Sequence, residues 1–92
     1  MISVEASARL RACLAKANLD RTAVFAAMQL AAAGWGQPHL HSGRGIRRLR
    51  GGIFECRLDR ANRLIFLVDG DRLLFDFAGN HDQVRGYLKN RR

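Results

Sequence analysis

Three side chains in the second half of the sequence are of the types that can act on a phosphate group. His81 comes directly after a strand-like run, and Arg57 and Arg63 stand in the two runs before it. Guanidinium groups bind phosphate oxygens and stabilise charge that develops on them, and a histidine can give or take a proton near neutral pH. These are the parts needed to cleave RNA by attack of its own 2′-hydroxyl. Such cleavage requires no metal, and we predict neither a metal site nor a cofactor.

The same residues also have a simpler structural explanation. Arg63 could form a plain cross-strand ion pair with Asp76, worth about 0.2–1 kcal/mol. Asp82 could favour the N-terminus of a terminal helix electrostatically, with Asn80 as its N-cap and His81 incidental. The residue types alone leave both explanations open.

The chain is strongly basic. It has 16 Lys and Arg against 8 Asp and Glu, a net charge of +8. Between Arg44 and Arg63, seven arginines stand against only Glu55 and Asp59. This concentration favours a polyanion such as nucleic acid as partner. The alternative is a solvated face that keeps the protein soluble, in which Glu55 and Arg57 are ordinary strand residues.

The length of 92 residues, with 48% apolar residues and one proline, predicts a single globular domain over residues 1–92. The longest apolar run, residues 23–33, is about half the length of a membrane span. The N-terminus lacks the pattern of a secretory signal, so we expect a cytoplasmic protein with no membrane contact. Cys13 and Cys56 fit neither a disulfide framework nor a metal motif, and we expect both to be reduced, buried and inert.

Helical periodicity predicts a hairpin of two helices in the first third of the chain. The first covers about residues 5–17 and ends at Asn18, and the second runs from the N-cap Asp20 to about residue 33. Before them, Ile2 and Val4 could form a short edge strand. The apolar faces of the two helices are Leu10, Cys13, Leu14 and Ala17, and Val24, Phe25, Met28, Ala31 and Ala32.

The second half reads as a loop followed by strands. Residues 35–45 form the loop, in which His39 and His41 are loop residues rather than metal ligands. Runs at 46–49, 53–58, 63–68 and 72–77, separated by turn residues such as Gly51-Gly52, predict an antiparallel meander. The fold class is therefore α+β, a helical hairpin packed on a twisted antiparallel sheet of three to four strands with a short C-terminal helix.

The turns predict which side chains face each other. A type I′ turn at Asp69-Gly70 and a three-residue loop at 60–62, with Asn62 left-handed, fix the register. The last strand then brings residues 79–81 to the end of the sheet next to Arg63. The predicted pairs are Phe66–Leu73, Leu64–Phe75, Arg63–Asp76, Leu58–Leu64, Cys56–Phe66 and Arg57–Ile65. The predicted core face of the sheet is Phe54, Cys56, Leu58, Leu64, Phe66, Val68, Leu73, Phe75 and Phe77.

The segment IRRLRGGIFECRLDRANRLIFLVDGDRLLFDFAGNHDQVRGYL resembles the RelE/ParE superfamily of small bacterial toxins over residues 44–88. The pattern is a basic residue and Leu before a Gly turn, a strand ending in Arg, a strand with Arg, two hydrophobic residues and an aromatic, and a last strand running to a His. The run RLIF at 63–66 is the best marker. The resemblance implies a helical hairpin on a twisted antiparallel sheet and a type II toxin with a cognate antitoxin.

In the ribosome-dependent branch of that superfamily, the toxin cuts mRNA in the ribosomal A site. By position, Arg57 and Arg63 match the arginines that stabilise the scissile phosphate, and His81 matches a histidine that serves in proton transfer. Arg48 and Arg50 stand where lysines are frequent. With the nearby Arg44 and Arg47, they are the candidate RNA-binding or phosphate-binding residues.

The histidine that His81 matches belongs to a subgroup whose last strand ends in a His-Tyr pair, and the sequence departs from that subgroup. Its first strand is short or missing. Asp82 stands where the subgroup has a tyrosine, and the nearest tyrosine, Tyr87, is expected one or two helical turns away. His81 could therefore be acid or base, with Glu55 or Asp82 as its counterpart. The branch that poisons DNA gyrase through the same fold, a binding module without catalysis and a basic RNA-binding domain remain alternatives. The sequence leaves the oligomeric state open.

Overall fold

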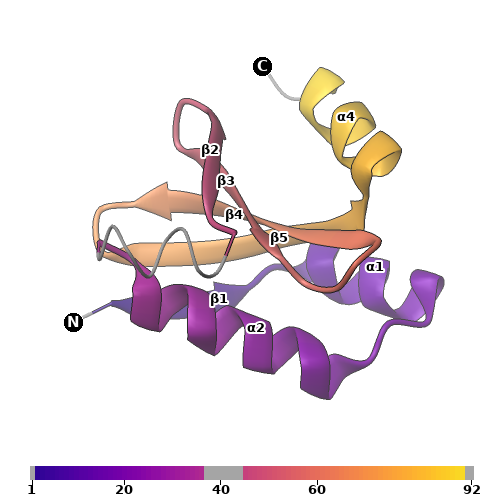
Figure 1. Cartoon of the computed structure of the whole chain (residues 1–92), viewed down its shortest axis with the longest axis horizontal. Coiled ribbons are helices and arrows are strands. Elements are labelled where there is room, and N and C mark those ends of the chain that lie inside the picture. The colour runs from indigo at the N-terminus through magenta and orange to yellow at the C-terminus, as the bar shows by residue number, and fades with distance from the viewer. Residues whose placement is uncertain (1, 37–44, 91–92) are drawn as a thin grey trace.

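The computed structural model describes residues 2–36 and 45–90, which form a β-sheet with helices on both of its sides (Figure 1). The class is α+β, as predicted. Within the described residues, no helix has the length and apolar character needed to cross a membrane. In chain order the elements are β1 (Ser3–Ala6), α1 (Ala8–Ala17), α2 (Arg21–Gly34), β2 (Arg47–Arg50), β3 (Ile53–Arg57), β4 (Asn62–Asp69), β5 (Arg72–Asn80) and α4 (His81–Lys89).

The sheet has five strands in the order β1-β5-β4-β3-β2. β1 runs parallel to β5, with Val4 opposite Leu73, and the other neighbouring strands are antiparallel. The prediction of a purely antiparallel sheet of three to four strands is therefore wrong in strand number and in this parallel pair. Because two helices and three strands separate β1 from β5, no hairpin turn sets their relative direction, and a run of four residues gives little periodicity to read.

The sequence correctly identified the residue that ends α1 and the residue that caps the start of α2. The side chain of Asp20 accepts a backbone hydrogen bond in the first turn of α2, and Asn18 ends α1 with a left-handed φ of 55°. Helix α1 starts at Ala8, with Ser7 as N-cap, rather than near residue 5. The preceding residues 3–6 are held extended by their pairing with β5.

The two sides of the sheet bury different hydrophobic clusters. Helices α1 and α2 cover what we call the inner face, and α4 lies on the opposite side, the outer face (Figure 1). The outer cluster is smaller and is centred on Ile65, Val84 and Tyr87. The inner cluster consists of Leu10, Leu14, Val24, Met28, Ala31, Cys56, Leu64, Phe66, Leu73, Phe75 and Ala78.

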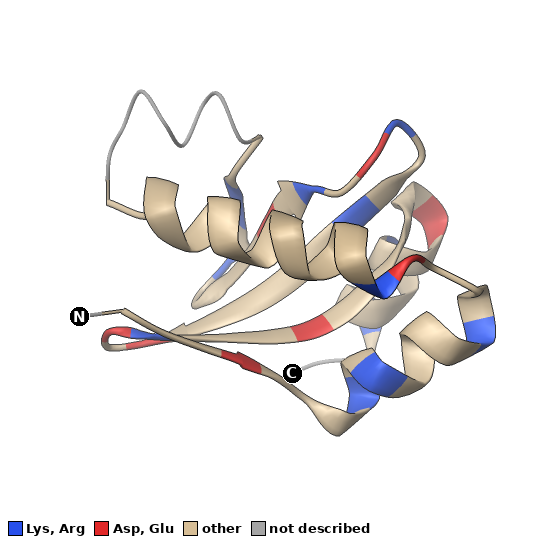
Figure 2. Ribbon diagram, turned by 90° about the horizontal axis from the view of Figure 1, so that it is seen from below, with Lys and Arg blue, Asp and Glu red and all other residues tan. Residues whose placement is uncertain are grey.

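Helix α2 buries a narrower stripe than predicted. Val24, Met28 and Ala31 are buried, but Phe25 is 51% exposed. Successive residues of an α-helix are about 100° apart, so Phe25 lies at the edge of a stripe centred on Val24 and Met28. Figure 2 shows α2 uncharged along its length apart from Arg21 at its start.

The β4–β5 hairpin has a different turn from the one predicted. Asp69 pairs with Arg72, so the two turn residues are Gly70 and Asp71, and Gly70 has the positive φ of 62°. The turn predicted at Asp69-Gly70 is wrong, and the register moves by two residues. Because the side-chain period of a strand is two, this shift leaves the predicted faces unchanged next to the turn. The observed pairs there are Phe66–Phe75, Leu67–Leu74 and Val68–Leu73.

The β3–β4 connection is also displaced by two residues. Residues 58–61 form the loop instead of 60–62, and Asn62 is already in β4. An oxygen of the Asp59 carboxyl accepts backbone hydrogen bonds from Ala61 and Asn62 at 2.9 and 2.8 Å. This Asx-type turn closes the loop without a left-handed Asn62. The observed pairs are Phe54–Phe66, Glu55–Ile65, Cys56–Leu64 and Arg57–Arg63.

A β-bulge in β5 changes the faces near the C-terminus of the sheet. Ile65 pairs with Phe77 and Phe66 with Phe75, which makes Asp76 the extra residue of the bulge. Phe77 therefore packs in the outer cluster, and its predicted place on the inner face is wrong. A bulge inserts one residue into a strand, and a simple apolar–polar alternation does not reveal where it occurs.

The two cysteines are free. Cys13 is half-buried rather than buried, and Cys56 is buried in the inner cluster. Burial raises the pKa of the Cys56 thiol to about 12, and the nearby Glu55 adds to the increase. Because only a thiolate is a strong nucleophile, Cys56 is unreactive at neutral pH.

Candidate functional site

Two arginines face each other on the outer face, where β3 ends and β4 begins. Arg57 and Arg63 are direct cross-strand partners. Neither forms an ion pair or a side-chain hydrogen bond with any other described residue. Like charges directly opposite each other destabilise a sheet. An anion bound between the two guanidinium groups would relieve this repulsion.

A pocket of about 290 Å³ contains both side chains. Its wall includes Glu55 and Arg47, whose carboxylate Oε2 and guanidinium Nη2 are 2.9 Å apart. The Glu55 side chain is only 6% exposed, whereas that of Arg47 is 67% exposed, so the carboxylate lies beneath Arg47. We call this site the arginine pocket, and its lining residues are Gly45, Ile46, Arg47, Glu55, Arg57 and Arg63.

Gly45 brings the backbone before β2 close to Arg57. Its φ of +68° is one that side-chain-bearing residues rarely adopt, and a Cβ atom built there would lie 3.3 Å from the Cβ of Arg57. The glycine therefore allows the chain to pass beside Arg57 and form one wall of the arginine pocket.

The junction between β5 and α4 lies at the same end of the sheet. Gly79 faces Arg63 and Asn80 faces Asn62, so the predicted meeting of residues 79–81 with the Arg63 end of the sheet is confirmed. The predicted pairing of Arg63 with Asp76 is wrong, because the bulge and the shifted turn together move the register by three residues at this end.

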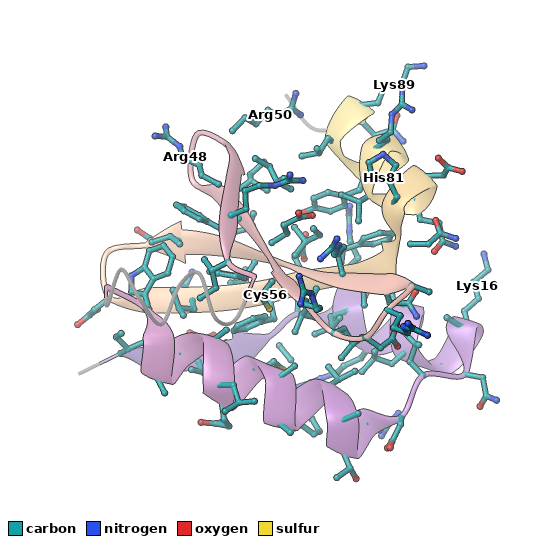
Figure 3. All side chains as sticks on the ribbon, viewed as in Figure 1. Lys16, Arg48, Arg50, Cys56, His81 and Lys89 are labelled. Carbon is teal, nitrogen blue, oxygen red and sulfur yellow. The ribbon has the colours of Figure 1, made fainter. Side chains whose placement is uncertain are left out.

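His81 is the first residue of α4 and is exposed. A capping box spans it: Asn80 Oδ1 accepts from the Gln83 backbone at 2.9 Å and Gln83 Oε1 accepts from the Asn80 backbone at 2.8 Å. Asn80 is thus the predicted N-cap. His81 is not among the residues lining the arginine pocket. Figure 3 shows it on α4, across from the β2–β3 hairpin that carries Arg48 and Arg50.

Asp82 belongs to a different hollow, of about 510 Å³, between α4 and the β2–β3 hairpin. It lies in the first turn of α4, where a negative charge interacts favourably with the helix dipole. The structure therefore places Glu55 among the arginines and Asp82 elsewhere. The residues lining this second hollow are Arg50, Asp82, Arg85, Gly86, Leu88 and Lys89.

The predicted RNA-binding arginines occupy different positions. Arg47 is in the arginine pocket. The Arg48 Nε donates to the Gly51 carbonyl at 2.9 Å within the hairpin, and the Arg50 guanidinium donates to the Leu88 carbonyl at the end of α4. Arg44 lies outside the described residues, as do His39 and His41. No group of three or more His, Cys, Asp and Glu that could hold a metal occurs in the described part of the chain.

Tyr87 lies inside the outer cluster rather than beside His81. It is 5% exposed, and its hydroxyl donates to Asp76 Oδ2 at 2.7 Å. Sequence reasoning missed this contact. The signal available was the spacing of Val84, Tyr87 and Leu88, which marks them as one apolar face of the terminal helix.

Neither a scan of protein-family models nor a search of curated proteins gives a match. Solved structures, in contrast, match almost the whole chain. A copper-bound mutant toxin from Helicobacter pylori aligns with a TM-score of 0.68 and 18% identity, covering 91% of this chain and 99% of its own. YafQ from Escherichia coli gives 0.65 and 15%, covering 91% and 98%. A YoeB–YefM toxin–antitoxin complex from Staphylococcus aureus gives 0.60 and 13%, covering 88% and 98%.

These likenesses establish that the chain has the fold of RelE-superfamily toxins. The resemblance drawn from RLIF and the order of elements is thereby confirmed for the fold. At identities of 13–18%, the fold alone follows, and function must be argued from the site.

Proposed function

We propose that this chain, which has the fold of RelE-superfamily toxins, is the toxin of a type II toxin–antitoxin system and a ribosome-dependent mRNA endoribonuclease. The observation that carries the proposal is the facing pair Arg57 and Arg63. Two guanidinium groups are held opposite each other without a carboxylate partner among the described residues. A phosphodiester group supplies the negative charge that this arrangement lacks.

The arginines act on the scissile phosphate. Attack of the 2′-hydroxyl on the adjacent phosphorus places additional negative charge on the phosphate oxygens, and Arg57 and Arg63 stabilise that charge. The phosphate-binding site is already in place when the substrate binds, because the two guanidinium donors belong to neighbouring strands of one sheet.

Proton transfer requires two further groups, one to take the proton of the 2′-hydroxyl and one to give a proton to the leaving 5′-oxygen. Glu55 is the carboxylate that shares the arginine pocket, which favours it over Asp82 as the base. His81, at the start of α4, is then the acid. The ribosome and the mRNA close over the exposed end of the sheet and bring His81 into reach in this scheme.

The proposed protein partner is a cognate antitoxin, supplied by another chain. The E. coli structures of YafQ with DinJ and the S. aureus structure of YoeB with YefM are toxin–antitoxin complexes. In the present chain, an acidic or amphipathic antitoxin segment would cover the basic outer face and block the arginine pocket. The proposed partners of this chain, which are the ribosome, the mRNA and the antitoxin, place its action in the cytoplasm in this proposal.

Induced expression in a bacterium that lacks the antitoxin tests the proposal. Growth and primer extension on a reporter mRNA are compared for the wild type, Arg63→Ala and His81→Ala. We expect codon-phased cuts and growth arrest for the wild type, and cleavage lowered by about 10²–10³ in each variant. Arg72→Ala is the matched control, because Arg72 is an exposed β5 arginine at the opposite end of the sheet, and it should cut at the wild-type rate.

A binding function without cleavage is the second candidate. It is favoured by the position of His81 outside the lining of the arginine pocket, which is compatible with a basic face that only binds, as in a gyrase inhibitor. Arrest without mRNA cuts, unchanged by His81→Ala, would support this candidate and reject the nuclease. Salt-dependent binding to free RNA without growth arrest would instead indicate an RNA-binding domain.

A further inference from the structure

A buried side-chain hydrogen bond joins the last strand to the last helix. The Tyr87 hydroxyl donates to Asp76 Oδ2 at 2.7 Å, and the two residues are 5% and 7% exposed. Buried polar groups are costly unless they are hydrogen-bonded. Two such groups placed against each other therefore fix how α4 sits on the outer face.

The aromatic ring of Tyr87 adds contacts with two other segments. It stacks on Phe77 of β5 with a centroid distance of 5.0 Å and an interplanar angle of 21°. The Cζ atom of Arg9, in α1, lies 5.6 Å from the centre of the same ring. Tyr87 thus attaches the C-terminal half of α4 to β5 and α1, beside the hydrogen bond from Arg50 to the Leu88 carbonyl and the packing of Val84 and Leu88 in the outer cluster.

The β-bulge explains why Asp76 is available for this contact. Asp76 is the extra residue between the pairs Ile65–Phe77 and Phe66–Phe75, and both Asp76 and Phe77 contact the tyrosine of α4. The same extra residue shifts the end of β5 by one position, so that Gly79 rather than Ala78 faces Arg63. Bulges of this kind occur next to active sites, where they redirect side chains.

We propose that Asp76 and Tyr87 are positioning residues that hold α4, and through it His81, in a fixed relation to Arg57 and Arg63. The inference rests on the proposed function of His81. The helix is joined to the sheet at its start by the capping box of Asn80, in its second turn by the buried bond of Tyr87 to Asp76, and at its end by the exposed bond of Arg50 to Leu88. Without the buried bond, the second turn of α4 shifts on the outer face and the imidazole of His81 loses its orientation.

Three variants of the full chain test this role. Tyr87→Phe keeps the ring and removes the hydroxyl, Asp76→Ala removes the acceptor, and Asp76→Asn retains a carbonyl oxygen that can accept from the tyrosine. Val24→Ala is the matched control, because it removes methyl groups from the inner cluster, far from α4. Single-turnover cleavage of mRNA on programmed ribosomes gives the maximal rate and the half-saturating toxin concentration. Amide hydrogen exchange measures the opening of α4.

We expect Tyr87→Phe and Asp76→Ala to lower the maximal rate about 10- to 100-fold at an unchanged half-saturating concentration. Exchange in residues 84–88 should accelerate about tenfold while β4 and β5 keep their protection. On a logarithmic scale, the maximal rate of Asp76→Asn should fall by no more than half as much as that of Asp76→Ala. Val24→Ala should accelerate exchange throughout and cleave at the wild-type rate per folded molecule.

Two results would overturn the inference. In the first, amide exchange of Tyr87→Phe is unchanged in α4 or is accelerated equally in all elements. The bond would then not attach the helix specifically. The other is an unchanged cleavage rate despite a loosened α4. If the wild type cuts no RNA, the proposed function fails and the positioning of a catalytic His81 fails with it, whereas the exchange data separately decide whether the bond attaches α4.

Discussion

The inner and outer faces of the sheet are built from alternate residues of the same strands, yet they differ in almost every property. The inner face packs the larger apolar cluster, with Trp35 against Phe54 at 4.8 Å and Phe66 against Phe75 at 4.9 Å between ring centres. The outer face carries the opposed Arg57 and Arg63. The difference fits a division in which the inner face supplies most of the stability and the outer face carries the proposed site.

The buried acidic groups follow the same division. Glu55 and Asp76 are 5% and 7% exposed, and both belong to the outer side, where each meets a specific partner, Arg47 or Tyr87. A buried carboxyl without a partner would be costly. Buried carboxyl groups that have specific partners fit the proposed site on the outer face. A face that only supports folding can avoid their cost by burying apolar side chains.

The largest effect is expected on the inner face. Phe66→Ala should lower the free energy of unfolding by about 3–5 kcal/mol, because Phe66 is fully buried and contacts aromatic rings on both sides. Phe25→Ala is the matched control, since Phe25 is 51% exposed, and should cost well below half of that amount. Urea unfolding followed by circular dichroism measures both. Equal losses would mean that the inner face is not the main source of stability.

The next largest effect is a loss of stability at high pH, caused by the buried thiol of Cys56 on the inner face. The pKa of Cys56 is raised from 9.0 to about 12, so above pH 9 the unfolded chain loses a proton that the folded chain retains. Stability is therefore lost as the pH rises, by about 2 kcal/mol between pH 8 and 10.5. Urea unfolding at both values measures the loss, and Cys56→Ala should show a correspondingly smaller decrease. An identical decrease in that variant would show that Cys56 titrates as an exposed thiol.

Much of this division was predictable from the sequence. The alternation in β3 and β4 placed Cys56, Leu64 and Phe66 together on the inner face, and Arg57 and Arg63 opposite to them. Two turns were each misplaced by two residues without changing these faces, because the side-chain period of a strand is two. Local propensity identified Asp20 and Asn80 as helix caps, which depend only on neighbouring residues.

The errors occur where the structure depends on distant contacts. The parallel pairing of β1 with β5 joins segments at opposite ends of the chain. The bulge at Asp76 leaves the apolar–polar pattern of the strand looking regular. Asp76 accepts its hydrogen bond from Tyr87, which is eleven residues away in the sequence. For the site, the sequence named Glu55 and Asp82 as alternatives, and only the three-dimensional packing shows that Glu55 lies in the arginine pocket and Asp82 in another hollow.

The smallest and most discriminating effect concerns the repulsion between Arg57 and Arg63. Arg57→Gln or Arg63→Gln should raise the free energy of unfolding by about 0.2–1 kcal/mol, although each removes a residue of the proposed site. The double variant should gain little more than either single one, because the same repulsion is removed only once. Urea unfolding at low salt measures the changes, which should shrink in about 1 M salt through screening.

Phosphate supplies the complementary test of the same pair. Added at low ionic strength, it should stabilise the wild type by binding the folded state, and stabilise both glutamine variants less. Arg72→Gln, at the other end of β5, should respond as the wild type does. If either substitution at Arg57 or Arg63 instead cost more than about 1 kcal/mol, these guanidinium groups would be structural contacts, and the outer face would resemble the inner one in serving the fold.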